Sequence, residues 1–125
     1  MREHFHLFAY GTLRRGGRSE ELLQGAEWVG HASVGGVLYD IDGQHPALVL
    51  YGSTPVEGDL WRCPIGLLPV IDQYESVESG LFRRIGVKAQ TAEGADYACW
   101  TYVAGPALTR KLTPARRIER WTQTG

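Results

Sequence analysis

The segment Phe5-His6-Leu7-Phe8-Ala9-Tyr10-Gly11-Thr12-Leu13 decides how the fold begins. Its first six residues are aromatic-rich and lead directly into Gly11, which is the pattern of a strand that is buried on at least one face and ends in a tight turn. Gly11 lets the backbone bend so that consecutive N–H groups can face one anion. A carboxylate or a developing oxyanion suits such a nest. A strand-ending turn with an exposed basic flank explains the same residues at least as well.

Two helices and several further strands are predicted after this turn. A short helix capped by Ser19 runs to about Gln24 and stops at Gly25. Pro69 fits the first turn of a second helix, so the regular part of that helix is expected to begin near Leu68. Strand-forming residues broken by glycines predict strands over roughly 27–39, 47–51, 56–62, 83–89 and 96–103. The pattern therefore indicates a β-rich core with two small helices, in the α+β class.

The composition is that of one ordinary globular domain. The chain has 125 residues, 43% of them hydrophobic and 22% charged, and a formal net charge of −1. This balance gives no reason to expect nucleic acid or anionic lipid as a partner. The start lacks the layout of a secretory signal, and no stretch is apolar for long enough to span a bilayer, so a cytoplasmic location is predicted. Cys63 and Cys99 are too few for a disulfide framework and are expected to be reduced and buried.

The last twenty residues differ in charge from the rest. Residues 106–125 hold five basic groups and one acidic group. We expect a domain over residues 1–105, followed by a segment that is either a docked terminal helix of the same domain or a mobile basic arm. Its basic run is more often a solvated face than a binding site for an acidic partner. The run comprises Arg110, Lys111, Arg116, Arg117 and Arg120, with Trp121 beside them.

Glu75 is the strongest candidate for acid/base chemistry. On a helix, Leu68, Ile71 and Glu75 share one face, and the first two are aliphatic. The carboxylate therefore points where apolar side chains point, and burial raises the pKa of a carboxyl group toward the range that is useful for proton transfer near neutral pH. The alternative is that position 75 marks the fraying end of the helix, where a solvated Glu needs no explanation.

Other chemical candidates are weaker. His4 and His6 lie on one side of a strand, but no third or fourth metal ligand is evident, so ordinary surface or partly buried histidines are favoured over a metal site. Serine and cysteine nucleophiles lack an elbow motif or a local signature that ties them to a base. The Gly11 turn matches neither the dinucleotide-binding loop nor the P-loop lysine motif. No cofactor is therefore predicted.

An ordered set of motifs along the chain resembles the γ-glutamylcyclotransferase-like family, which includes γ-glutamylamine cyclotransferase and the AIG2-like and YtfP-like proteins. The similarity covers about residues 5–104. A Tyr-Gly-Thr-Leu turn follows the first strand, and a Leu-Pro-x-x-Asp-x-Tyr-Glu segment comes before a strand of the Phe/Tyr-x-Arg type. The middle of the chain adds Gly36-Val37-Leu38-Tyr39-Asp40, His45-Pro46-Ala47 and Val56-Glu57-Gly58-Asp59-Leu60-Trp61.

The resemblance implies a mixed, barrel-like β-sheet of about five to seven strands, with flanking short helices and a cavity beside the first turn. It assigns the catalytic role to Glu75. It also assigns substrate binding to Tyr10, Gly11, Thr12, Leu13 and Tyr102. Where many members have a tyrosine at the start of the strand after the catalytic Glu, this sequence has Phe82, so any contact made by that hydroxyl is missing and the choice of substrate stays open.

The implied activity is metal-independent cyclisation of a γ-glutamyl amide or amine to 5-oxoproline, with release of the free amine. A monomer or a homodimer is expected. Two alternatives stay open, namely removal of a γ-glutamyl cap from a biosynthetic intermediate, and a non-catalytic protein that binds a small ligand on the same fold. An unused buried carboxylate costs stability, so Glu75 argues against the second alternative.

Overall fold

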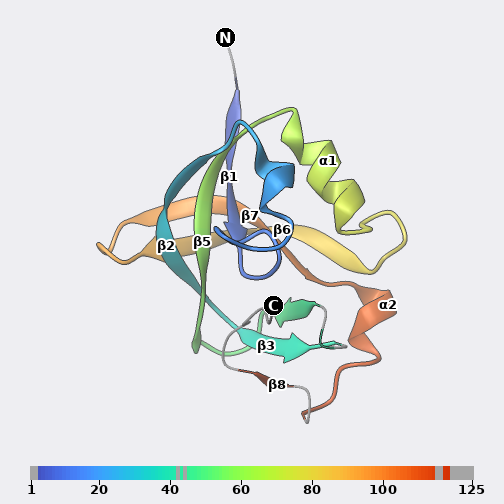
Figure 1. Cartoon of the computed structure of the whole chain (residues 1–125). Coiled ribbons are helices and arrows are strands. Elements are labelled where there is room, and N and C mark those ends of the chain that lie inside the picture. Colours follow the sequence, from blue (N-terminus) through green and yellow to red (C-terminus); the bar gives the residue numbers. More distant parts are fainter. Residues whose placement is uncertain (1–2, 42, 44, 115–116, 119–125) are drawn as a thin grey trace.

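The protein is an open-ended barrel of strands with short helices at its side (Figure 1). The computed structural model describes residues 3–41, 43, 45–114 and 117–118. The strands are β1 (His4–Ala9), β2 (Glu27–Gly35), β3 (Val37–Asp40), β4 (Pro46–Val49), β5 (Pro55–Pro64), β6 (Phe82–Thr91), β7 (Asp96–Ala104) and β8 (Arg117–Ile118). The helices are the 3-10 helix η1 (Glu20–Leu23) and the α-helices α1 (Leu67–Tyr74) and α2 (Pro106–Thr109).

Five strands close the barrel. Going around it, β1, β5, β2, β6 and β7 are antiparallel neighbours, and β7 returns to β1 as a parallel partner, with Leu7 opposite Trp100. The order then continues outward from β7 through β4 and β3 to β8. The α+β class and the mixed, barrel-like sheet are therefore confirmed. The described sheet has eight strands, one more than the upper number expected, because the two-residue β8 joins β3.

The predicted strand over 27–39 is two strands. β2 ends at Gly35 and β3 begins at Val37, with Gly36 between them. A Cβ atom on Gly36 would lie 2.8 Å from the carbonyl oxygen of Val49, so only glycine allows the chain to pass this closely to β4. The N–H of Gly36 donates to the carbonyl of Thr54 instead of to a ladder partner. The crowding at this glycine explains why one long strand does not form.

The first part of the basic C-terminal segment packs against the barrel. Pro106 starts α2, and Leu108 from this helix is buried. The N–H of Gly105 donates to the carbonyl of Leu81, and that of Ala107 donates to the carbonyl of Gly80, so α2 is tied to the loop after α1. Arg110 and Lys111, which were predicted as part of a basic run, are exposed, and Arg117 lies in β8. The other two members of the predicted run, Arg116 and Arg120, and the neighbouring Trp121 lie outside the described residues.

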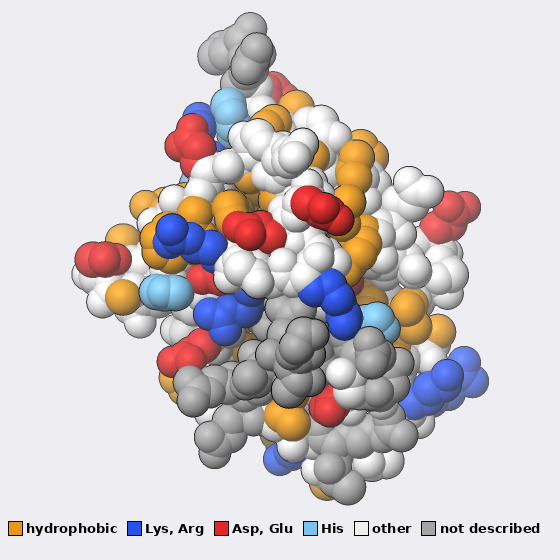
Figure 2. All heavy atoms as spheres, in the orientation of Figure 1, with side chains coloured by type: hydrophobic (Ala, Val, Ile, Leu, Met, Phe, Trp, Pro, Cys, Tyr) orange, Lys and Arg blue, Asp and Glu red, His pale blue; other side chains and the backbone are white. Residues whose placement is uncertain are grey.

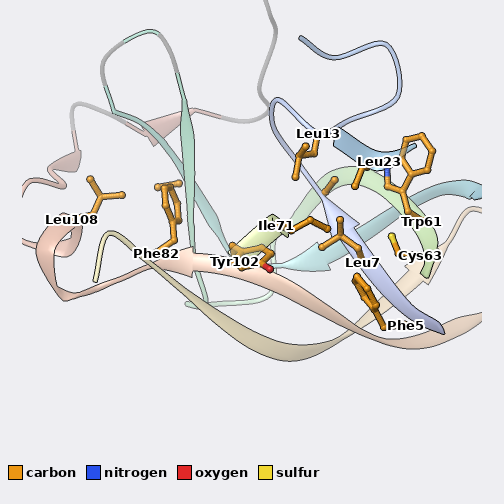
Figure 3. Close-up of a cluster of buried hydrophobic side chains, with 12 residues drawn as sticks. Phe5, Leu7, Leu13, Leu23, Trp61, Cys63, Ile71, Phe82, Tyr102 and Leu108 are labelled. Atoms are coloured by element: carbon orange, nitrogen blue, oxygen red, sulfur yellow. The ribbon is translucent and has the colours of Figure 1, made fainter. Parts of the chain in front are cut away.

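The side chains of β1 divide between two cores. Leu7 and Ala9 point into one cluster, and Phe8 and Tyr10 point into the other, as expected for residues that alternate along a strand. Figure 3 shows the first cluster, which extends from Phe5 past Leu7 and Tyr102 to Phe82 and Leu108. Residues of both clusters line one cavity at the end of β1. The end of β1 is consequently held on two sides, which makes it a rigid place for a site.

The described surface and helices give three further observations. On the face drawn in Figure 2, acidic and basic side chains are interspersed rather than separated into single-sign patches. None of the helices in the described part of the chain is long and apolar enough to cross a membrane. Cys63 and Cys99 are both free thiols and both buried, as predicted, and burial raises the pKa of each.

Candidate active site

A cavity of about 150 Å³ lies at the end of β1, between α1 and the β6–β7 hairpin. It is smaller than the roughly 300 Å³ at which pockets for drug-sized ligands begin, so it suits a group of amino-acid size. All the residues predicted for the site line this one cavity. These are Tyr10, Gly11, Thr12, Leu13, Glu75 and Tyr102.

Glu75 lies directly after the last residue of α1. Its backbone N–H donates to the carbonyl of Ile71 at 2.9 Å, which closes the final helical turn. Ser76 then has a φ of 55°, an uncommon conformation for a residue other than glycine, and the chain turns away from the helix axis. Both interpretations of position 75 are therefore partly correct, because the helix does end there and the side chain still lines the cavity.

The Glu75 carboxyl group has a pKa close to neutral pH. The residue as a whole is partly exposed, but it lines a cavity whose other lining residues include the apolar Leu7, Leu81 and Phe82. Burial disfavours the carboxylate and raises the pKa of Glu75 to about 7. Such a group can take up or release a proton at physiological pH, which an ordinary carboxyl group does poorly.

The loop after β1 presents unpaired backbone donors. Among the described residues, no acceptor is within hydrogen-bond reach of the N–H groups of Gly11, Thr12 or Leu13. The carbonyls of the same loop are used, since the Gly11 carbonyl accepts from the N–H of Arg14 at 3.0 Å and the Thr12 carbonyl accepts from that of Ser19 at 2.9 Å. These three N–H groups lie beside the cavity and have no partner in the described part of the chain, so they are available to bind an anion or a developing oxyanion.

Gly11 is required for a reason different from the expected one. It is not among the residues with a positive φ, so the turn does not depend on a conformation that favours glycine. A Cβ atom here would instead lie 2.7 Å from Cγ of Pro46, which is buried beside it. Gly11 is thus a point of close approach between the loop and β4, and both Gly11 and Pro46 line the cavity.

We expect Gly11→Ala to lower the free energy of unfolding by about 1–3 kcal/mol, because an added methyl group must displace a rigid, buried proline ring. Urea denaturation of the two proteins measures the difference. Gly66→Ala is the matched control, since Gly66 has a helical φ and nothing within 4 Å of its Cβ position. Equal stability of the two alanine variants would contradict the steric role of Gly11.

The Tyr10 hydroxyl is engaged within the core. It donates to the carbonyl of Tyr102 and accepts from the N–H of Leu48 at 3.2 Å. Burial raises the pKa of this hydroxyl, and the nearby Glu75 raises it further. Tyr10 therefore joins β1, β4 and β7 through its hydroxyl and presents its ring, rather than a polar group, to the cavity.

Thr12 is positioned by a tyrosine that sequence reasoning missed. The hydroxyls of Thr12 and Tyr74 are 2.7 Å apart, and the Tyr74 hydroxyl donates to Oγ of Ser19 at 2.8 Å. The prediction that Ser19 caps a helix is wrong, because its side chain makes no capping bond and η1 is only a 3-10 helix. The hydroxyl of Ser19 instead helps to join the loop to α1. The Asp-x-Tyr-Glu motif, in which Tyr74 precedes Glu75, was the signal available for this residue.

A buried aspartate anchors the loop from the opposite side. Asp59 of β5 is 1% exposed, and its Oδ2 accepts from Nε of Arg14 at 3.0 Å and from the N–H of Arg15 at 2.9 Å. Its Oδ1 accepts from Nε1 of Trp28 at 3.3 Å and lies 3.0 Å from Nδ1 of His31. Although burial alone raises the pKa of Asp59, the bonds from Arg14 and its neighbours outweigh burial and lower it.

Tyr102 also has an acidic partner. Its hydroxyl donates to Oδ1 of Asp72 on α1 at 2.6 Å, and Nε of Arg84 donates to the same oxygen at 2.9 Å. Arg84 is the direct cross-strand partner of Tyr102 in the β6–β7 ladder. Sequence reasoning missed both Asp72 and Arg84, although each lies in one of the motifs that carried the resemblance.

Phe82 and His45 complete the lining of the cavity. Phe82 is 7% exposed and packs in the same buried cluster as Tyr102 and Leu108 (Figure 3). At this position, where many members were expected to have a tyrosine, the protein therefore has an apolar ring and no hydroxyl. Leu81, next to it, is 36% exposed, and His45 is exposed as well. Leu81 and His45 therefore contribute exposed side chains to the lining of the cavity.

The predicted histidine pair has other contacts. Nδ1 of His4 lies 3.2 Å from Nη2 of Arg62, and the ring of His6 lies 5.1 Å from that of Tyr97. Within residues 3–41, 43, 45–114 and 117–118, no three His, Cys, Asp or Glu side chains are grouped so that they could hold a metal ion.

The fold is shared with several solved structures. A mouse AIG2-like protein has the same architecture, with a TM-score of 0.79 and 18% identity over 98% of this chain and 91% of its own. A structure named gamma-glutamyl cyclotransferase has a TM-score of 0.70 and 23% identity over 82% of this chain and 67% of its own. A protein specific to uropathogenic E. coli has a TM-score of 0.68 and 23% identity over 94% and 89%.

The sequence itself assigns the family. The model of the family described as "Gamma-glutamyl cyclotransferase, AIG2-like" matches residues 7–123, which is nearly the whole chain. The chain therefore belongs to this family, as the ordered motifs predicted. No curated protein matches the sequence. The solved structures are less than a quarter identical to the chain, so the likeness to them extends to the fold.

Proposed function

We propose that the protein is a γ-glutamylcyclotransferase-type enzyme that converts a γ-glutamyl amide or amine to 5-oxoproline and releases the free amine. One observation carries this proposal. The Glu75 carboxyl group, with a pKa of about 7, lines the same small cavity as the unpaired N–H groups of Gly11, Thr12 and Leu13. Membership in the gamma-glutamyl cyclotransferase, AIG2-like family supports the same reaction class.

The substrate supplies its own nucleophile. The α-amine of a γ-glutamyl group can attack the γ-carbonyl carbon and close a five-membered ring, so the protein need not provide a nucleophile. It must hold the folded conformer, and well-oriented intramolecular reactions show that this can be worth on the order of 7–11 kcal/mol of barrier. A cavity of about 150 Å³ confines one glutamyl group in this way.

Glu75 carries the proton in both halves of the reaction. As a carboxylate it takes a proton from the α-ammonium, which frees the lone pair for attack. The new C–N bond gives a tetrahedral intermediate, whose oxyanion the N–H groups of Gly11 to Leu13 stabilise. The attacking nitrogen gives its second proton to solvent water as the ring forms. The bond to the leaving nitrogen then breaks as Glu75, now a carboxylic acid, gives its proton to that nitrogen, which yields neutral 5-oxoproline and the free amine. The carboxylate is restored with each turnover.

The proposal is tested by product balance. Purified protein is incubated with a panel of γ-glutamyl amines, γ-glutamyl dipeptides and lysine-linked γ-glutamyl compounds, and 5-oxoproline and free amine are measured together. Equimolar release of both products from at least one class is expected. A ligand that raises the melting temperature while no class yields 5-oxoproline would overturn the enzymatic proposal in favour of a binding protein.

The pH dependence follows from the pKa of Glu75. The active free enzyme holds Glu75 as a carboxylate, so kcat/KM is expected to fall below a pKa of about 7, by roughly tenfold per pH unit once the pH is well below it. Initial rates between pH 5 and pH 8 measure this decrease in kcat/KM on the acid side. A rate that is level from pH 5.5 to pH 7.5 would contradict the role of Glu75 as the base.

A further inference from the structure

Tyr102 is fixed at both of its ends. Its backbone carbonyl accepts from the hydroxyl of Tyr10, and its own hydroxyl donates to Oδ1 of Asp72 at 2.6 Å. The residue is 4% exposed and lines the cavity. In Figure 3 its ring lies between Phe82 on one side and Ile71 on the other, with the oxygen turned away from Phe82. The phenol therefore has one fixed orientation.

Asp72 is in turn held by Arg84. Nε of Arg84 donates to the same Oδ1 at 2.9 Å, and the guanidinium lies 4.4 Å from the ring centroid of Trp100, which limits its movement. Both partners of this ion pair are only 26% exposed. A carboxylate paired with an arginine is an acceptor and has no proton to donate. Tyr102 must consequently be the donor in its bond with Asp72.

The direction of this bond decides what Tyr102 can offer a ligand. A phenol has one hydrogen to donate and two lone pairs that accept. Because the hydrogen is committed to Asp72, the Tyr102 oxygen can act toward the cavity only as an acceptor. Burial and the bond to Asp72 raise the pKa of the phenol, so it stays neutral. A neutral acceptor beside Glu75 suits a cationic N–H donor and gives nothing to an anion.

We propose that the hydroxyl oxygen of Tyr102 accepts a hydrogen bond from the α-ammonium group of the γ-glutamyl substrate, in an orientation set by the positioning residues Asp72 and Arg84. This inference rests on the proposed function and deepens it. It makes Tyr102, together with Glu75, a residue that distinguishes γ-glutamyl compounds from acyl compounds of the same length that lack the α-amine.

The contact also prepares the amine for ring closure. After Glu75 removes one proton, the amine keeps two N–H groups and gains a lone pair. When one N–H donates a hydrogen bond to Tyr102 and Glu75 lies beside the nitrogen, the lone pair of the amine can point in only a restricted set of directions. The N–H groups of Gly11 to Leu13, which in the proposed reaction hold the γ-carbonyl oxygen, belong to residues that line the same cavity. Tyr102 thus orients the nucleophile while Glu75 moves the proton.

Binding measurements in a background that does not turn over test this inference. In protein carrying Glu75→Gln, the dissociation constants of an N-alkyl γ-glutamyl amide and of the matching N-alkyl glutaryl amide, which lacks the α-amine, are measured by calorimetry. Adding Tyr102→Phe is expected to weaken the amine-bearing ligand roughly tenfold and the glutaryl ligand less than twofold. Adding Asp72→Asn is expected to reduce the preference for the amine-bearing ligand as well, because an amide can donate to the phenol and reverse the bond.

Tyr97→Phe in the same background is the matched control, because Tyr97 is also in β7 but lies outside the cavity, and it should leave both constants unchanged. Equal weakening of both ligands by Tyr102→Phe would mean that the hydroxyl only supports the fold, and it would overturn the inference. An unchanged preference in Asp72→Asn would overturn the orienting role of Asp72. These outcomes do not depend on turnover, whereas the proposed reaction fails separately if the unmutated protein releases no 5-oxoproline.

Discussion

Glu75→Gln is expected to leave the protein folded and to lower the rate of 5-oxoproline release by roughly 10³-fold, within the range of about 10²–10⁴ that a positioned general acid or base contributes. Glutamine keeps the shape and much of the hydrogen-bonding capacity of the side chain but accepts no proton at neutral pH. Because the same carboxyl group serves first as the base and then as the acid, both halves of the reaction lose their proton carrier.

Glu78→Gln is the matched control for this prediction. Glu78 lies three residues further along the same loop and is exposed, so its variant should have the rate of the unmutated protein. Rates are compared by 5-oxoproline release at saturating and at low substrate concentration, so that kcat and KM are obtained separately. A Glu75→Gln protein that keeps even a tenth of the original kcat would exclude Glu75 as the proton carrier.

The stability of Glu75→Gln shows whether a loss of activity comes from the missing carboxyl group or from a disturbed fold. The pKa of Glu75 is raised in the folded state from an ordinary 4.5 to about 7, so the folded protein binds more protons than the unfolded chain between these values. Stability contributed by the protonated carboxyl group is therefore lost as the pH rises toward 7, by up to about 3 kcal/mol at 1.36 kcal/mol per pKa unit. Glu75→Gln should consequently melt at a higher temperature than the unmutated protein at pH 8 and show little difference at pH 5.

The ordered motifs were sufficient to predict the family, the barrel and the residues of one cavity. The Tyr-Gly-Thr-Leu turn and Glu75 are 62 positions or more apart, and the hydrophobic face of α1 was enough to turn Glu75 toward the core. The preference of proline for a first helical turn correctly placed Pro69 near the start of α1. Local patterns of this kind depend only on the period of one element and on neighbours in the sequence.

The roles of individual atoms could not be predicted in this way. That the Tyr10 hydroxyl would bond with Tyr102 and Leu48 depends on how β1, β4 and β7 meet in space. Ser19 has the sequence features of a helix cap, but the hydroxyl of Tyr74, far along the chain, takes its side chain instead. At Ser19 a tertiary partner replaced a local one, and in both cases the bonded residues come from distant parts of the chain, so no local pattern in the sequence predicts the bond.

Asp59 is the clearest example of a residue whose importance only the structure reveals. In the sequence it is one acidic residue within a predicted strand. In the fold it is a buried acceptor for two residues of the loop after β1 and for two of β2. Asp59 therefore holds the segment that begins with Gly11, and it does so from outside the cavity, since it does not line it.

We expect Asp59→Asn to lower the free energy of unfolding by about 3 kcal/mol at pH 7, because asparagine can accept with only one of its two terminal atoms and its amide faces groups that donate. The lowered pKa of Asp59 means that its contribution is present above an ordinary carboxyl pKa of 3.8 and is lost as the pH falls through the folded-state value. The difference in the free energy of unfolding between Asp59→Asn and the unmutated protein should thus become smaller in acid.

Urea denaturation of Asp59→Asn at pH 7 and at pH 3 measures both parts of this prediction, with Asp96→Asn as the control. Asp96 is 54% exposed and its oxygen is 4.0 Å from Nζ of Lys88, so its loss should change stability by less than about 0.5 kcal/mol. Because Asp59 fixes Arg14 and Arg15 just beyond the unpaired amides, its variant should also lower kcat through misplacement of Gly11 to Leu13. A destabilised Asp59→Asn protein with unchanged kcat would mean that the loop keeps its place without this anchor and that its contacts with Pro46 and Tyr74 are enough to position the amides.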